Sequence, residues 1–278
     1  MKRRLLGGTS CTPVFSVMNL SLQSSIVARY KSLSQKARVL TEAWVESEVS
    51  CPGCGGSLQL LPANTRTADF QCKQCSEMYQ LKSQSRPFGH RMLGAEYNTT
   101  IRSIQNGMHP SLILLYYDPY SWTVKGLEFV HKSWITFSAI IARTPLGPNA
   151  RRAGWQGCQI DLDRIPALAR IQAIKEGTNQ PGEQVRTQWF KAQSIAGATA
   201  ENRCWISDVL RLIDLLPGEF TLQDMYRFED NLAKLHPSNH NIRAKIRQQL
   251  QVARDLRVIE FLGRGRYRKI NFANPGAA

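Results

Sequence analysis

The chain has 278 residues, of which 36 are Lys or Arg and 21 are Asp or Glu, so its formal net charge is +15. This length has room for two domains, and a hydrophobic content of 42% argues against a chain that is disordered throughout. The basic excess favours a polyanionic partner, most commonly nucleic acid, although a basic enzyme without such a partner is the alternative. No apolar run approaches the ~18 residues of a transmembrane helix, so the sequence implies no membrane.

The N-terminus opens with the basic run Met1-Lys-Arg-Arg4, as a signal peptide does. Gly7-Gly8 and several polar residues then interrupt every apolar stretch. We therefore expect residues 1–17 to form a disordered extension, or to lie upstream of an original start at Met18. We expect the protein to be located in the cytoplasm.

The first domain is predicted to mix helices and strands. Apolar residues recur at helical spacing in 24–45, and a continuous apolar run at 112–117 is typical of a strand buried on both faces. In chain order we predict a helix or two at 24–45, strands at 65–71 and 77–83, a helix at 95–105, and strands at 112–117 and 124–131. This order favours an α/β (α+β) domain whose mixed sheet is flanked by helices. Residues 144–166 are rich in Gly and Pro and predict an irregular loop.

A second domain is predicted after two polar, breaker-rich segments at 176–182 and 196–202. Beyond them we predict three helices and two strands, at 205–216, 221–235 with Thr221 as N-cap, 241–255, 258–262 and 267–272. Three helices followed by a basic hairpin describe an α+β winged helix, a relative of the helix-turn-helix. We therefore divide the chain into an extension at 1–17, a first domain at 18–190 and a winged-helix domain at 191–278.

Four of the seven cysteines form two CxxC pairs, Cys51/Cys54 and Cys72/Cys75, separated by 17 residues. Four thiolates can close a tetrahedral zinc site, which has no open position and is therefore structural. Two redox-active motifs or a chance pairing are the alternative. The odd number of cysteines also fits a reducing compartment, and we expect the other three to be ordinary buried or free thiols: Cys11, Cys158 and Cys204.

Around the second pair lies a pattern of charged and polar residues, in which Asp69 precedes Gln80 by ten intervening residues and Lys82 follows. Residues 80 and 82 share one face of a strand. Carboxylate and carbonyl oxygens hold Mg²⁺, and a lysine beside the metal can stabilise the charge of a reacting phosphate. The pattern resembles, with one substitution, the metal-binding core of PD-(D/E)xK nucleases. Taken alone it is weak, since a solvated strand with an exposed lysine would look the same.

A larger set of short sequence segments, called words below, resembles the DpnI-like, Dam-replacing family of restriction endonucleases over about residues 19–270. In order, the words are Tyr30-Lys-Ser32, Gln35-Lys-Ala-Arg-Val-Leu-Thr-Glu42 with Trp44, the two cysteine pairs, Ala68-Asp-Phe70, Leu81-Lys-Ser83, Ala150-Arg-Arg-Ala-Gly-Trp155 with Gly157-Cys158, Phe220-Thr-Leu222, Asp224-Met-Tyr-Arg-Phe-Glu229, Lys245-Ile-Arg-Gln-Gln-Leu-Gln251, Ile259-Glu-Phe261 and Gly263-Arg-Gly-Arg-Tyr-Arg-Lys269. The resemblance implies a PD-(D/E)xK nuclease domain with inserted four-cysteine zinc knuckles, followed by a winged helix. It also implies a partner, double-stranded DNA whose GATC adenine is N6-methylated.

The resemblance implies roles for individual residues. Asp69, Gln80 and the backbone carbonyl of Leu81 would bind Mg²⁺, for which Mn²⁺ could substitute, and Lys82 would be the catalytic lysine. Gln80 departs from the family motif, which usually has Glu there, so the site loses one negative charge. Weaker Mg²⁺ binding, a preference for Mn²⁺ or loss of cutting would follow. Three glutamates are candidates for a migrated carboxylate: Glu42, Glu46 and Glu77.

Candidates for DNA contact lie in two places. Arg can pair with guanine or phosphate, and an aromatic face can pack against an N6-methyl group, which makes the cluster Arg151, Arg152 and Trp155 a candidate reader of the methylated base. A core tryptophan with solvated arginines is the alternative. The other candidates lie on the polar face of the third predicted helix and in the hairpin after it, where a merely solvated surface is the alternative: Arg243, Lys245, Arg247, Gln248, Gln251, Arg264 and Arg266.

Three functions are compatible with these patterns. The leading hypothesis is a type II restriction endonuclease that hydrolyses phosphodiester bonds of double-stranded DNA at N6-methyladenine-containing GATC sites with Mg²⁺. The second is a reader of adenine-methylated DNA whose catalysis is impaired at Gln80. The third is a zinc-ribbon, winged-helix regulator whose likeness to nucleases is superficial. No protein partner is implied, and we expect a monomer or a weak dimer.

Overall fold

The computed structural model describes residues 17–63, 65 and 68–270, so the expected extension, apart from Val17, lies outside the described residues. The first part of the chain forms a seven-stranded mixed sheet in the order β1-β2-β3-β5-β6-β9-β10. Its strands are β1 (Leu58–Leu60), β2 (Phe70–Cys72), β3 (Met78–Gln84), β5 (Ser111–Asp118), β6 (Thr123–Val130), β9 (Arg170–Lys175) and β10 (Thr178–Asn179). Neighbouring strands are antiparallel except β3 and β5, whose parallel pairing needs the long crossover between them. The predicted mixed sheet is confirmed.

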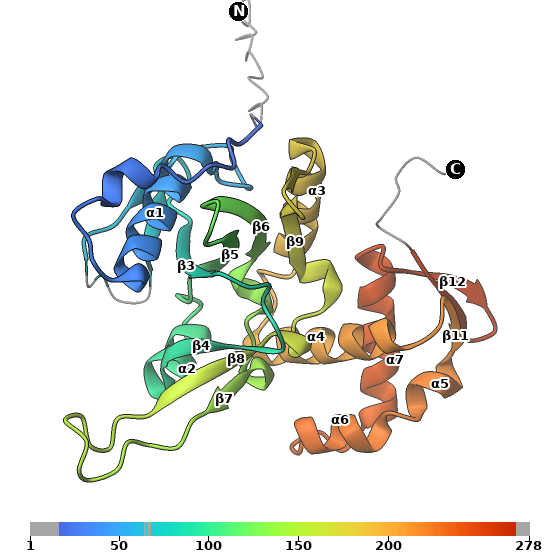
Figure 1. Ribbon diagram of the computed structural model, residues 1–278. Coiled ribbons are helices and arrows are strands. Elements are labelled where there is room, and N and C mark those ends of the chain that lie inside the picture. The colour runs from blue at the N-terminus through green and yellow to red at the C-terminus, as the bar shows by residue number, and fades with distance from the viewer. Residues whose placement is uncertain (1–16, 64, 66–67, 271–278) are drawn as a thin grey trace, which may run out of the picture.

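Helices α1 (Leu33–Glu48) and α3 (Gly182–Gln193) cover one face of this sheet (Figure 1). Tyr79 and Ser83 lie four residues apart on β3, and because side chains alternate along a strand they share a face. The Oγ1 of Thr41 in α1 lies 3.1 Å from Ser83 Oγ, and the ring of Trp189 in α3 lies 6.0 Å from the ring of Tyr79. By the same alternation, Gln80 and Lys82 face the other side of the sheet. The predicted helical segment at 24–45 is confirmed as a short 3-10 helix, η1 (Ser24–Val27), and α1.

The crossover between β3 and β5 contains helix α2 (Tyr97–Gln105) and the first strand of a second sheet, whose order is β4-β8-β7. Its strands are β4 (Arg91–Glu96), β7 (Ile140–Ala142) and β8 (Gly157–Asp161). The irregular loop predicted at 144–166 is therefore wrong in its second half, which contains β8 and the 3-10 helix η4 (Leu162–Arg164). The prolines and glycines of this region predict a loop, but the region also contains a short strand, in which Cys158 and Ile160 are buried. Residues 143–156 form a long hairpin loop that projects from the body of the molecule (Figure 1).

The second part of the chain consists of helices α4 (Ala200–Leu215), α5 (Leu222–Tyr226), α6 (Glu229–Leu235) and α7 (Ile242–Asp255) and of strands β11 (Glu219–Thr221), β12 (Ile259–Gly263) and β13 (Arg266–Lys269). The three strands pair in the order β11-β13-β12. Thr221 caps α5 through a reciprocal capping box with Asp224, as predicted. The single helix predicted at 221–235 is in fact two, α5 and α6, with a break at Arg227 and Phe228. Helices followed by a strand hairpin confirm the winged-helix arrangement.

Helix α4 joins the two parts (Figure 1) and is buried along most of its length, with Trp205 and Ile206 in the core. Ser207 Oγ donates to the Arg164 carbonyl at 3.2 Å, and Asp214 Oδ2 accepts from the Ala167 amide at 3.1 Å. The remaining 3-10 helices lie in the connections: η2 (Lys132–Trp134), η3 (Phe137–Ala139) and η5 (Ala167–Ala169). Within the described ranges, no helix combines the length and the apolar character needed to cross a bilayer.

Candidate functional site

The four cysteines of the two CxxC pairs come together beside β2 and β3. Their sulfur atoms all lie within 4.8 Å of one another, with Cys51 Sγ 3.6 Å from Cys75 Sγ and Cys54 Sγ 3.4 Å from Cys72 Sγ. These separations exceed the ~2.05 Å of a disulfide, and all four cysteines are free. Burial raises the pKa of the Cys51 thiol, so a thiolate there needs a cation beside it. The arrangement fits a closed four-thiolate zinc site of the structural kind.

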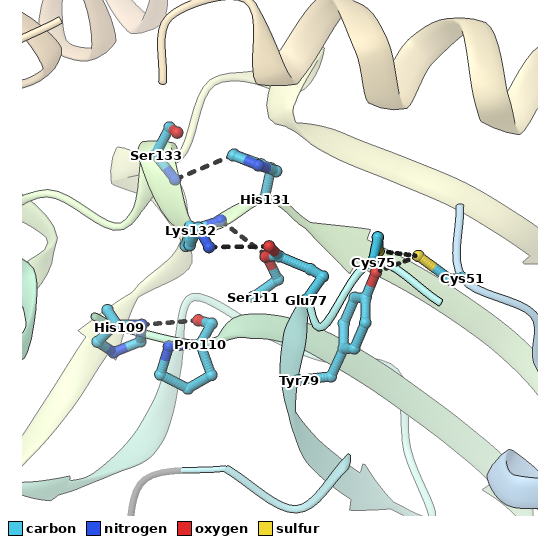
Figure 2. Close-up of polar contacts among 10 residues, drawn as sticks. All are labelled: Cys51, Cys75, Glu77, Tyr79, His109, Pro110, Ser111, His131, Lys132 and Ser133. Carbon is cyan, nitrogen blue, oxygen red and sulfur yellow. Dashed lines mark hydrogen bonds and ion pairs between the residues drawn. The ribbon is translucent and has the colours of Figure 1, made fainter. Parts of the chain in front are cut away.

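Tyr79 connects this cysteine cluster to strand β3. Its hydroxyl lies 3.0 Å from Cys51 Sγ (Figure 2). Burial raises the pKa of Tyr79 well above its usual value, so the hydroxyl keeps its proton and can donate to a Cys51 thiolate. The ring is held from the other side by Trp189 and Phe129, at 6.0 and 6.3 Å between centroids. The residue next to Tyr79 in β3 is Gln80, so the cysteine cluster bears directly on the strand that carries the predicted catalytic residues.

Asp69 is placed against β3 by its backbone and by its carboxylate. The Asp69 amide donates to the Tyr79 carbonyl at 2.8 Å, and Asp69 Oδ2 accepts from the Leu81 amide at 2.8 Å. Burial raises the pKa of Asp69, whereas the Leu81 amide and the charge of Lys82 lower it. Burial likewise lowers the pKa of Lys82, which the Asp69 carboxylate raises. The two charges are therefore electrostatic neighbours in a half-buried position, where each partly offsets the desolvation of the other.

Gln80 occupies the position between Tyr79 and Leu81 and is half-buried. It lies opposite Leu112 of β5 in the parallel register. Among the described residues its side chain has no hydrogen-bonding partner, so its amide oxygen is available to a ligand. Asp69, Gln80, Leu81 and Lys82 are thus brought together, as the sequence predicts, and their oxygens are the kind that a hard cation takes.

The projecting loop between β7 and β8 carries the cluster of Arg151, Arg152 and Trp155. The Arg152 guanidinium lies 4.7 Å from the centroid of the Trp155 ring, a cation–π distance. A Cβ at Gly157 would meet that ring at 2.8 Å, so the glycine is what allows Trp155 to fold back over β8. Both arginines are exposed and Trp155 is half-buried, so Trp155 is not a plug of the main core.

Helix α7 and the β12–β13 hairpin hold the second set of candidates, and their surroundings differ. Gln248, Gln251 and Arg264 are exposed. Arg247 donates to the Tyr226 hydroxyl at 2.7 Å, and Arg243 pairs with Glu229 at 2.7 Å. Lys245 instead points to α4, where its Nζ lies 3.0 Å from Asn202 Oδ1. Arg266 pairs with Glu219 at 3.3 Å across the sheet.

Comparison with known families accounts for nearly the whole described chain. A family described as DpnI, the Dam-replacing family, matches residues 18–198, and the Dam-replacing HTH domain matches residues 201–269. The chain belongs to the Dam-replacing family. It is therefore a methylation-dependent restriction endonuclease, a DNA-cutting enzyme whose C-terminal helix-turn-helix domain binds DNA. The boundary expected at 190/191 falls within α3, whereas the two family matches meet between α3 and α4.

For this Dam-replacing protein, the structure separates the three glutamates that were candidates for a migrated carboxylate. Glu77 accepts from Lys132 Nζ at 2.8 Å and from Ser111 Oγ at 2.7 Å, as Figure 2 shows. Glu46 accepts from the Leu60 amide at 3.1 Å. Glu42 pairs with Arg38 at 2.7 Å on α1.

Two residues near the predicted site were not singled out from the sequence. Arg38 could have been found from its spacing, because it precedes Glu42 by four residues and therefore shares one face of a helix with it. For Tyr79 the sequence contains no signal beyond its place in a strand, since its partner Cys51 is 28 residues away.

Proposed function

We propose that the chain is a type II restriction endonuclease that hydrolyses phosphodiester bonds of double-stranded DNA at GATC sites whose adenine is N6-methylated, with Mg²⁺ as cofactor. The observation that carries the proposal is the half-buried Asp69 carboxylate at the start of β2, which accepts a hydrogen bond from the Leu81 amide and feels the charge of Lys82. Perturbed charges of opposite sign that share a site are typical of catalytic centres. Membership of the family supports the reaction class.

The residues present fit a divalent cation. Asp69 and Gln80 would bind it through side-chain oxygens and Leu81 through its backbone carbonyl, which is an oxygen set of the kind that Mg²⁺ takes. Burial raises the pKa of Asp69, and a cation would favour its ionised form. Bound there, Mg²⁺ would polarise the scissile phosphate and lower the pKa of an attacking water, and Mn²⁺ could substitute. Lys82 would place its ammonium group against the phosphate and stabilise the negative charge that develops on it.

The methylated base would be read by the projecting loop and by the helix-turn-helix domain together. In the loop, the stacked pair of Arg152 and Trp155 offers an aromatic face for an N6-methyl group and a guanidinium for guanine or phosphate. In the second domain, the exposed amides of Gln248 and Gln251 could read adenine edges. The exposed guanidinium of Arg264 would contact the DNA backbone. The other candidate contacts are Arg151, which is exposed, and four residues that also have partners within the protein: Arg243, Lys245, Arg247 and Arg266.

The domain division, the state of assembly and the cellular location are part of the same proposal. We assign the nuclease part to 18–190 and the DNA-binding part to 191–278, with α3 as the junction. A cytoplasmic location is supported by the six described cysteines, all of which are free thiols. A monomer or weak dimer is proposed.

The experiment uses purified, zinc-replete protein and one plasmid prepared with and without GATC adenine methylation, in Mg²⁺ and separately in Mn²⁺. We expect cutting of the methylated plasmid alone. Asp69→Asn, which keeps an acceptor for the Leu81 amide, and Lys82→Ala should abolish cutting. Lys175→Ala, at an exposed lysine of β9, should cut like the wild type. Equal cutting of both plasmids would contradict the methylation dependence.

Gln80 favours one second candidate, a reader of methylated DNA that no longer cuts. The amide has no negative charge, and Asp69 would then be the sole carboxylate among the three predicted ligands. The outcome that would select this reader is specific: no cutting in either metal, together with a tighter gel shift for methylated than for unmethylated DNA.

A further inference from the structure

Gln80 leaves the proposed cation site one carboxylate short, and the structure shows where a replacement could come from. Of the three glutamates near β3, Glu77 is held by Lys132 and Ser111, and both of its oxygens are occupied. Glu46 is held by the Leu60 amide. Glu42 is left, and its only polar partner among the described residues is Arg38.

Two contacts orient helix α1, and with it Glu42, against strands β1 and β3. One turn beyond Glu42, Glu46 accepts from the amide of Leu60, which pairs with Phe70, the neighbour of Asp69. On the residue before Glu42, the Oγ1 of Thr41 lies 3.1 Å from Ser83, the neighbour of Lys82. Residues four apart share one face of a helix. Helix α1 is therefore anchored on β1 beside the start of β2 and on β3 at Ser83, with Glu42 between the two anchors.

The Glu42 carboxylate is largely buried, and Arg38 is its one polar partner among the described residues. The Glu42 side chain is 17% exposed, whereas that of Arg38 is 66% exposed. Arg38 binds one oxygen of Glu42, Oε1, and leaves Oε2 without a hydrogen bond among the described residues.

We propose that Glu42 supplies the carboxylate that Gln80 lacks, as a ligand of the cation bound by Asp69, and that Arg38 positions Glu42 and neutralises it in the absence of the cation. This inference rests on the proposed Mg²⁺ site and names one further residue of it. Two carboxylates around a divalent cation restore the charge balance that an amide at position 80 removes.

The test measures cation binding directly, by titration calorimetry of zinc-replete protein with Mn²⁺ in the absence of DNA. Glu42→Gln should weaken Mn²⁺ binding at least by the ~10-fold that loss of even an outer-shell partner costs. Glu46→Gln is the matched control, since it lies one turn away on the same face of α1 and binds the Leu60 amide rather than the site. It should leave Mn²⁺ affinity within about twofold of the wild type.

A rescue variant makes the test specific to the missing charge. Gln80→Glu should raise Mn²⁺ affinity in the wild-type background and should restore most of the affinity that Glu42→Gln loses. Residues that serve one site are non-additive in such a cycle. A thermal melt of each variant checks that α1 stays folded. Glu42→Gln should melt no lower than Glu46→Gln, because each substitution weakens one hydrogen-bonded contact of α1.

The outcomes separate this inference from the proposed function. If the wild type binds Mn²⁺, Asp69→Asn removes the binding and Glu42→Gln behaves like Glu46→Gln, then Glu42 is not a ligand and only the inference fails. If the wild type binds no Mn²⁺ that Asp69→Asn can remove, the proposed cation site itself is wrong. Additive effects of Glu42→Gln and Gln80→Glu would also overturn the inference.

Discussion

Two regions of the first domain meet at strand β3, the cysteine cluster and the cation site proposed at Asp69, and they are built in different ways. The cysteine cluster takes all its ligands from two short motifs, and their sulfurs lie within 4.8 Å of one another. The Asp69 site instead draws Asp69 from the edge of β2, Gln80 to Lys82 from β3, and Glu42 from α1 as proposed. Its buried charges have pKa values displaced in the directions that cost stability. The cysteine cluster is therefore expected to stabilise the fold, whereas the Asp69 region is expected to give up stability for chemistry.

The largest expected effect is loss of the zinc site. Cys54→Ser removes one of four ligands, and we expect the protein to lose bound zinc and to unfold in the nuclease part. Structural zinc binding is worth about 10 kcal/mol or more, which is as large as the whole stability of a typical domain. Zinc content by mass spectrometry and a thermal melt would measure the loss.

Cys158→Ser is the control for that loss, because Cys158 is buried but lies outside the cluster, 3.6 Å from Thr100 Oγ1. It should keep the full zinc content. A Cys54→Ser protein that melts like the wild type would show that the cluster is not a stabilising metal site.

The second prediction is a loss of activity without a loss of stability. Lys82→Met should reduce the rate of cleavage by ~10²–10³-fold, the typical cost of removing one preorganised charge at a reacting centre. It should change the melting temperature little, because an apolar side chain of similar length removes the cost of burying the Lys82 charge while the attraction between Lys82 and Asp69 is lost. Single-turnover cleavage and a melt of the same sample provide both values. A variant that both cuts slowly and melts early would make Lys82 a structural residue.

The two regions also differ in how far the sequence predicts them. The zinc ligands follow from spacing alone, because both pairs are local and close one site between them. Asp69, Gln80 and Lys82 follow because a strand alternates its faces and β2 precedes β3 directly. The position of Glu42 depends on how α1 packs, and Thr41 meets Ser83 across 42 residues of chain, which no local pattern contains. Strands β4, β7 and β8 do not follow from the sequence either. They are short, lie among glycines and prolines, and pair with strands that are distant in the sequence.

A third, smaller effect should appear on acidification, and it touches both regions. Burial lowers the pKa of His109, which feels the charge of Lys82, and that of His131, which packs on Trp189, to about 4 each. The unfolded chain takes up these protons near the usual value of 6.5, whereas the folded protein does so only near 4. The stability that comes from keeping the two histidines neutral is therefore complete above pH 6.5 and is lost as the pH falls. At pH 5 each histidine should lower the free energy of unfolding by about 2 kcal/mol.

Urea unfolding at pH 7 and pH 5 checks this prediction, with His109→Gln and His131→Gln compared with the wild type. Each variant should lose less stability between the two pH values than the wild type does. His131 accepts from the Ser133 amide at 3.2 Å through Nδ1, so protonation there breaks a bond as well (Figure 2). Equal losses in all three proteins would assign the acid sensitivity to other groups, such as the zinc thiolates.

The smallest predicted effect concerns the residue that joins the two regions, because Tyr79 binds Cys51 and directly precedes Gln80. Tyr79→Phe keeps the ring and its contacts with Trp189 and Phe129 but removes the 3.0 Å contact with the sulfur. We expect about 1 kcal/mol of lost stability and ~10-fold faster loss of zinc to a chelator. Tyr117→Phe is the matched control, since Tyr117 is buried against Trp122 and its hydroxyl has no hydrogen bond among the described residues. If zinc release quickens in Tyr79→Phe while cleavage of zinc-replete protein is unchanged, the two regions share a strand but act independently. A parallel loss of cleavage would mean that the cysteine cluster positions the catalytic strand.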